Sequence, residues 1–302
     1  MSRAYDNAAD GRFPSGRRNL IINGAYTVWQ RSTTSSSNGV NTADRWQQND
    51  ATFTQETSII PDNFQYSMKV VANGSGTPLL LQKIERPQVC GHILNQSITV
   101  SFYARSSNVN AITKLELNDE GGSGGRPDGG AQTLSAADTW ERITHTFTAP
   151  FSSLTGNSVA VILTFATSAT VYISGFQVEV GTVATPFEHR SYGEELALCQ
   201  RYYWKAGLKV ISAVASGKAN NTTDANFYIP YPVPMRSAPT STFSGMVIDF
   251  ATSTVSYSSV NLFASSTACL YNATGASGLT SGHGLLLRCG SDTDFIDFSA
   301  EL

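Results

Sequence analysis

The sequence has few charged residues. Only 14% of its 302 residues are Asp, Glu, Lys or Arg, against roughly 25% in an average globular protein. The net charge is −3, so the chain has no bulk basic field of the kind that neutralises nucleic-acid phosphates. We therefore expect neither DNA nor RNA as a partner.

Long apolar runs are also missing. No run approaches the ~20 residues that a membrane-spanning helix needs. Residues 1–11 lack the apolar segment of a secretory signal. We expect no membrane insertion and no signal-dependent export.

Metal and redox motifs are absent as well. The four cysteines form no C-x-x-C pair, and the four histidines form no H-E-x-x-H set. We expect the cysteines to be small buried residues, with a bond between Cys269 and Cys289 on neighbouring strands as the alternative. No metal or cofactor is required, although loop acids could bind a structural Ca²⁺: Asp44, Asp62, Asp119 or Glu120.

The sequence motifs that could indicate a catalytic site are incomplete or stand in the wrong structural context. A G-x-S-x-G run spans residues 121–125, but residues 126–129 (Arg-Pro-Asp-Gly) forbid the helix that a nucleophile elbow needs. The acids are dispersed, so the pair that glycoside cleavage requires cannot be identified. His145 alternates with threonines and is expected to face solvent. We expect no catalytic residue and no enzyme.

What the sequence does contain is β-structure. An apolar share of 41% can form real cores, and short runs alternate with period two between Gly, Asn and Ser turns. These runs predict an all-β protein whose residues 19–190 form a jelly-roll β-sandwich. The strands are expected at residues 67–71, 97–105, 142–148, 159–165 (near a sheet centre) and 171–180.

One helix is predicted after this sandwich. Ser191 and Glu194 fit a capping box, and Leu196, Cys199 and Tyr203 share a helical face from about residue 194 to 205. We interpret residues 191–206 as a linker helix.

Residues 207–302 are predicted to form a C-terminal antiparallel β-domain. Five strands are expected there, at residues 246–250, 261–264, 269–271, 285–289 and 295–298. The segment 227–234 carries three prolines, which cannot donate to a central ladder. We expect an edge segment or an arm against a neighbouring subunit.

Aromatic side chains are the candidates for sugar contact, because a ring face stacks on the C–H face of a pyranose. Trp29, Trp46 and Trp140 are expected in the core. Tyr228 and Tyr231 alternate with prolines and are the candidate binding residues, for a glycan or for a neighbouring subunit.

The first 18 residues are too polar to fold alone. They form either a frayed terminus or a peptide that orders against a partner in an assembly. The candidate anchoring side chains are Arg3, Tyr5, Arg12 and Phe13.

Three stretches carry a resemblance to a known group. The first comprises residues 19–25 (Asn-Leu-Ile-Ile-Asn-Gly-Ala), 29–31 and 43–46 (Ala-Asp-Arg-Trp). The second runs from Val178 to Arg190 and on through residues 194–203, and it is the most specific. The third is Pro234–Thr240 with the closing Ser299–Leu302. Together they resemble tail-fibre and virion proteins of tailed bacteriophages, across most of the chain from Asn19 onward.

The resemblance implies a virion component whose N-terminal unit is similar to a carbohydrate-binding-module jelly roll. It passes on no catalytic residue. We expect a phage tail fibre or receptor-binding subunit, a homotrimer that contacts a glycan or protein on the host surface and is held by other virion proteins. The main alternative is a capsid decoration or cement protein; a polysaccharide depolymerase is the least favoured.

Overall fold

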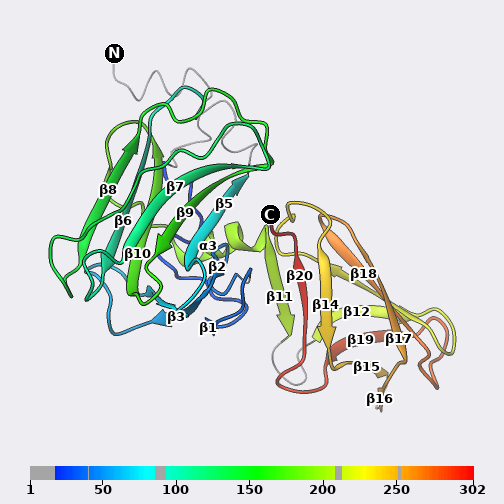
Figure 1. Ribbon diagram of the computed structural model, residues 1–302. Coiled ribbons are helices and arrows are strands. Elements are labelled where there is room, and N and C mark those ends of the chain that lie inside the picture. Colours follow the sequence, from blue (N-terminus) through cyan, green and yellow to red (C-terminus); the bar gives the residue numbers. More distant parts are fainter. Residues whose placement is uncertain (1–17, 40, 86–92, 208–212, 251–252) are drawn as a thin grey trace. The chain divides into compact units, whose positions relative to one another are not determined.

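The protein is described by a computed structural model, which covers residues 18–39, 41–85, 93–207, 213–250 and 253–302. The described chain is nearly all β and divides into two compact units, with the division between Glu195 and Leu196. All ladders between named strands are antiparallel, as the period-two patterns predict (Figure 1). No helix among these residues has the length and apolarity to cross a bilayer.

The first unit contains a six-stranded sheet in the order β1-β3-β4-β10-β6-β8. Its strands are β1 (Thr34–Ser35), β3 (Ala51–Glu56), β4 (Ser67–Ala72), β10 (Thr170–Val180), β6 (Ile98–Arg105) and β8 (Glu141–Phe147).

A four-stranded sheet in the order β2-β5-β9-β7 completes this unit. Its strands are β2 (Gln47–Asn49), β5 (Leu79–Glu85), β9 (Ser158–Phe165) and β7 (Ile112–Glu120). From β4 to β10 the chain changes sheet at every connection, which is the jelly-roll pattern expected from the sequence. The apolar strand β9 lies inside its sheet, as predicted.

One hydrophobic core fills the space between these sheets. Trp46, Tyr26 and Phe176 are fully or almost fully buried, and Trp46 packs edge-on against Phe176 with ring centroids 5.0 Å apart. The predicted packing of Trp46 and Trp29 is confirmed. Trp140 was wrongly predicted as core: it is only half-buried, because it stands outside the ladder, just before β8.

His145 also differs from expectation. It pairs with the buried Val100 across β6 and β8, which places it on the core side of the pleat. The ring is half-buried and packs edge-on against Phe147. The flanking threonines suggested an exposed face, but the strand register decides the orientation.

The predicted helix exists and is shorter than expected. Helix α3 spans Tyr192–Gln200, and the Ser191 hydroxyl accepts a hydrogen bond from the Glu194 amide at 3.3 Å, which confirms that part of the capping box. Residues from Tyr203 onward are a strand instead, because Tyr203 pairs with Ser299. Ladder pairing with a distant strand overrides the local helical pattern.

The second unit contains a three-stranded and a seven-stranded sheet, in the orders β11-β20-β14 and β16-β15-β19-β12-β13-β18-β17. The strands of the small sheet are β11 (Tyr203–Gly207), β20 (Phe295–Ser299) and β14 (Thr240–Ser244). Those of the large sheet are β16 (Ser253–Val255), β15 (Met246–Phe250), β19 (Gly284–Cys289), β12 (Ala213–Ala219), β13 (Ala225–Pro230), β18 (Ala268–Thr274) and β17 (Ser259–Ala264). All five strands predicted here are confirmed.

The edge position predicted for the proline-rich segment holds for its prolines but not for the start of its strand. Strand β13 lies inside the large sheet, between β12 and β18. Its pairing with β12 stops at Phe227, whereas its pairing with β18 continues to Pro230. The prolines therefore lie at and beyond the strand end, where no ladder donor is needed on the β12 side.

The described cysteines are buried and reduced: Cys199, Cys269 and Cys289. The alternative of a Cys269–Cys289 bond is wrong, because β18 and β19 are separated by β12 and β13 in the sheet. Cys90 lies outside the described residues.

Candidate functional site

The most exposed aromatic side chains of the second unit lie together on its large sheet. Tyr228 on β13 pairs with Leu270 on β18, and Leu270 pairs with Phe263 on β17. The chain neighbours of Tyr228, Phe227 and Ile229, are fully buried. The alternation of a strand therefore turns Tyr228, Leu270 and Phe263 together to the outer face.

Both rings project into solvent. Tyr228 is 61% exposed and Phe263 is 63% exposed. Among the described residues, neither ring stacks on another aromatic ring or lies under a cation. Isolated exposed apolar side chains are ordinary, but two large rings flanking a half-buried leucine make a contiguous apolar surface.

A row of asparagines runs beside these rings. On the same three strands, two positions away from the apolar residues, lie three asparagines that oppose one another: Asn226, Asn272 and Asn261. The Asn272 side-chain amide donates to Asn226 Oδ1 at 2.7 Å, and Asn261 donates to Asn272 Oδ1 at 3.4 Å. The Nδ2 group of Asn226 and Oδ1 of Asn261 have no partner among the described residues. The ladder therefore keeps donor and acceptor capacity for a ligand.

We call these six residues the Tyr228 face: Tyr228, Leu270, Phe263, Asn226, Asn272 and Asn261. Ring faces can cover the C–H surface of a sugar, while amides satisfy its hydroxyls. Ladder pairing places the three strands side by side in the large sheet, of which β17 and β18 are labelled in Figure 1. Lys218, opposite Asn226 on β12, is the charged side chain next in register.

The other predicted binding residue, Tyr231, lies in the core. It is 8% exposed, and its ring packs at 4.9 Å from Phe298 and 5.9 Å from Trp204. Its hydroxyl is buried without a hydrogen-bond partner in the described part of the chain, and burial raises the pKa of that hydroxyl well above its usual value. The structure therefore brings Tyr228, and not Tyr231, to a surface.

Phe263 and the asparagine row were not among the residues predicted from the sequence. Both lie in strands that were predicted, and the signal was available. In the run 260–264, Val260, Leu262 and Ala264 alternate inward, which leaves Phe263 as an aromatic residue on the outward face. An aromatic residue on the polar side of an alternating strand marks a contact surface.

The loop acids considered for Ca²⁺ serve the protein itself. Asp119 accepts hydrogen bonds from the backbone amides of Gly124, Thr155 and Gly156 at 2.8, 3.1 and 2.9 Å. Three backbone N–H donors therefore converge on this carboxylate. Asp119 thereby fixes the Gly-rich loop after β7.

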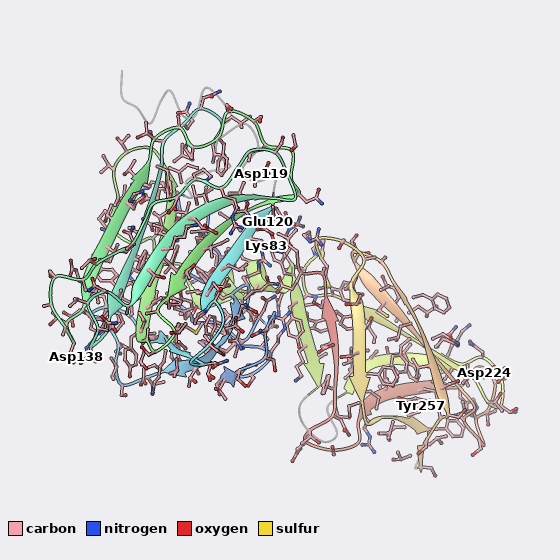
Figure 2. All side chains as sticks on the ribbon, in the orientation of Figure 1. Lys83, Asp119, Glu120, Asp138, Asp224 and Tyr257 are labelled. Atoms are coloured by element: carbon pink, nitrogen blue, oxygen red, sulfur yellow. The ribbon has the colours of Figure 1, made fainter. Side chains whose placement is uncertain are left out.

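The remaining loop acids do not gather around one point. Buried Asp44 accepts hydrogen bonds from the amide and side chain of Gln30, and Asp62 is exposed. Glu120 forms an ion pair with Lys83 at 3.6 Å across the four-stranded sheet, and Figure 2 shows both near Asp119. The described residues contain no group of three or more acids, histidines or cysteines placed for a metal ion.

The sequence stretches that carry the phage resemblance contact one another. Arg190 donates hydrogen bonds to the carbonyls of Asn19 and Ile21 at 2.6 and 2.9 Å. Glu195 accepts from the Asn23 amide at 2.6 Å. These hydrogen bonds close the first unit, so a role in folding accounts for these residues of the motifs.

The third of these sequence stretches, Pro234–Thr240 with the closing residues 299–302, forms a similar hydrogen-bonded closure in the second unit. The Arg236 side chain donates to the carbonyls of Ala300 and Glu301 at 2.8 and 3.1 Å. The proposed anchoring residues cannot be placed in this way, because Arg3, Tyr5, Arg12 and Phe13 lie outside the described residues.

Comparison with known proteins gives no family. No protein-family model and no curated protein matches the chain. Solved structures with a similar fold include the CBM22-1 xylan-binding domain of Xyn10C from Paenibacillus barcinonensis, with 11% identity over 56% of this chain and 100% of that chain and a TM-score of 0.36. TmCBM61 in complex with β-1,4-galactotriose has 12% identity over 54% and 99%, with a TM-score of 0.34.

A third similar structure is of a different kind. A cyclase from Fischerella sp. TAU is 13% identical over 55% of this chain and 98% of that chain, with a TM-score of 0.40. Values this low assign neither ligand nor activity to this chain.

Proposed function

We propose that the chain is a glycan-contacting structural protein, and that the Tyr228 face is its sugar-binding surface. The observation that carries this proposal is the pair of exposed rings, Tyr228 and Phe263, beside the partly unsatisfied asparagine row. The rings and amides supply the two kinds of contact that a neutral sugar needs. No step of bond cleavage belongs to the proposal.

We further propose that the chain is part of a tailed-phage particle, as a tail-fibre or receptor-binding subunit. The three sequence stretches that resemble phage virion proteins support this, and they form the hydrogen-bonded closures of the two units. A homotrimer would present three Tyr228 faces, and linked sites raise avidity without new contacts. Imaging of labelled particles distinguishes the tail from the head, where a decoration protein would lie.

The proposed binding surface is tested with Tyr228→Ala and Phe263→Ser in the full chain, against a panel of neutral bacterial surface oligosaccharides. Each change is expected to weaken binding about two- to tenfold, since a stacked ring contributes about 0.5–1.5 kcal/mol. Tyr192→Ala is the matched control, because that ring is 60% exposed but lies on α3.

Three results would contradict the proposal. One is unchanged binding in both variants, and another is an equal loss in Tyr192→Ala. The third is a change of oligomeric mass in the variants with unchanged binding per chain, which would make the Tyr228 face a subunit interface. Release of reducing ends from the oligosaccharides would instead reveal a depolymerase.

A further inference from the structure

A second row of side chains crosses the six-stranded sheet of the first unit. Tyr172 on β10 pairs with Lys69 on β4 and with Arg105 on β6, so the three side chains stand next to one another. The chain neighbours of Tyr172, Val171 and Ile173, are fully buried. The row of Lys69, Tyr172 and Arg105 therefore lies on the outer face, and we call it the Lys69–Arg105 row.

Two positive charges approach one aromatic ring in this row. Lys69 Nζ and Arg105 Cζ each lie 5.9 Å from the centre of the Tyr172 ring. The ring attracts both cations, but like charges drawn to one ring repel each other. An anion bound beside the ring would relieve that repulsion.

The charges of the row are only partly neutralised. Within the described ranges, no carboxylate forms an ion pair with Lys69, in contrast to Lys83 and Lys114. Arg105 lies 3.6 Å from the Asp138 carboxylate, which is 61% exposed. A pair so exposed to water is weak, so the row keeps a net positive charge.

The guanidinium of Arg105 is held in place by backbone. Its Nε donates to the Asp138 carbonyl at 2.7 Å, and Asp138 adopts the left-handed conformation with φ of 54°. Asn tolerates that conformation as well as Asp does. The carboxylate of Asp138, labelled in Figure 2, can thus be neutralised without moving the carbonyl that orients Arg105.

Apart from Asp138, the described surroundings of the row supply hydroxyls and an acid that is already engaged by its own loop. Thr54 opposes Lys69 on the next strand, and its hydroxyl shares a hydrogen bond of 3.0 Å with that of Thr34. Glu56, one pleat further on, is occupied by the amides of residues 57–59 and by the Ser58 hydroxyl. On the other side, Arg142 lies over the Tyr103 ring and adds positive charge.

We propose that the Lys69–Arg105 row binds an acidic sugar, whose carboxylate is held between Lys69 and Arg105 while its ring rests on the edge of Tyr172. The planar guanidinium of Arg105 supplies N–H donors in a fixed arrangement, and the ammonium group of Lys69 supplies a point charge. Threonine hydroxyls at positions 34 and 54 supply hydrogen bonds to sugar hydroxyls. This site lies in the first unit and does not depend on the Tyr228 face.

The test is calorimetric titration of the full chain with a galacturonate trisaccharide and with the neutral galactose trisaccharide. We expect Lys69→Gln to weaken binding of the acidic sugar about tenfold, as for loss of one charge-assisted hydrogen bond, and to leave any binding of the neutral sugar unchanged. Asp138→Asn is expected to strengthen binding of the acidic sugar severalfold, because it removes the opposing charge. Lys218→Gln is the matched control, and circular dichroism checks that each variant is folded.

Unchanged binding of the acidic trisaccharide in Lys69→Gln would overturn the proposal, as would an equal loss in Lys218→Gln or a loss in Asp138→Asn. Tyr228→Ala separates this site from the proposed function. It is expected to leave binding of the acidic sugar unchanged. If Tyr228→Ala abolishes that binding and Lys69→Gln does not, the Lys69–Arg105 row is wrong as a site while the Tyr228 face stands.

Discussion

At the scale of single residues, the separation of Tyr228 and Tyr231 by three positions decides which of the two tyrosines is available to a ligand. Tyr228 and Tyr231 are an odd number of residues apart, so an extended chain turns them to opposite sides. The structure follows this rule, with Tyr228 exposed and Tyr231 buried against Phe298. The proline spacing drew attention to both tyrosines, but only the parity of their separation distinguishes them.

The buried hydroxyl of Tyr231 gives a first prediction. Because it has no hydrogen-bond partner in the described part of the chain, its removal in Tyr231→Phe should cost nothing and stabilise the protein by up to about 1 kcal/mol. Urea unfolding at neutral pH measures this. A loss of stability, or a loss of glycan binding, would show that the hydroxyl has a partner or a ligand.

The buried tyrosines also predict the response to alkaline pH. Burial raises the pKa values of Tyr26 and Tyr271, whereas tyrosines of the unfolded chain ionise near pH 10. Below about pH 10 these tyrosines are protonated in both states and the fold keeps its full stability. Above it the unfolded chain loses their protons more readily than the folded one, so the free energy of unfolding falls as pH rises. We expect urea midpoints to fall above about pH 10. A midpoint that stays constant from about pH 9 to 11 would contradict this account.

At the scale of elements, the sequence predicted which segments are strands better than it predicted their neighbours. Period-two alternation located β4, β6, β8 and β10, and a continuous apolar run located β9. It could not show that Lys69, Tyr172 and Arg105 meet, because their contact depends on the register of three strands far apart in sequence. The early end of α3 has the same cause, since Tyr203 pairs with Ser299.

One loop provides the prediction at this scale. The carboxylate of Asp119 accepts three backbone amides and is buried, so Asp119→Ala leaves these donors unsatisfied. The free energy of unfolding should fall by about 3 kcal/mol. Asp62→Ala, at an exposed acid, should change it by less than about 0.5 kcal/mol. Equal small effects in chemical denaturation would show that the loop is not fixed by Asp119.

At the scale of the whole molecule, the two units offer different chemistry to a ligand. The second unit presents rings and amides on the Tyr228 face, and the first presents cations around Tyr172. The six-stranded and seven-stranded sheets hold these side chains by ladder pairing, which fixes their spacing. Both proposed sites act by contact, with no bond made or broken.

Assembly is the prediction at this scale. If the chain is a trimeric virion subunit, sedimentation equilibrium should give three times the chain mass of 32.4 kDa, and gold label on the chain should lie at the phage tail. A monomer at all accessible concentrations contradicts the trimer. Label on the head would support a decoration protein.

The central claim is that the outer face of the large sheet holds the sugar. A crystal structure of the full chain with the best neutral oligosaccharide tests it most directly. We predict an intact saccharide against the rings of Tyr228 and Phe263, with hydroxyls bonded to Asn226 and Asn261. A saccharide bound elsewhere, or found cleaved between two carboxylates, would contradict the account.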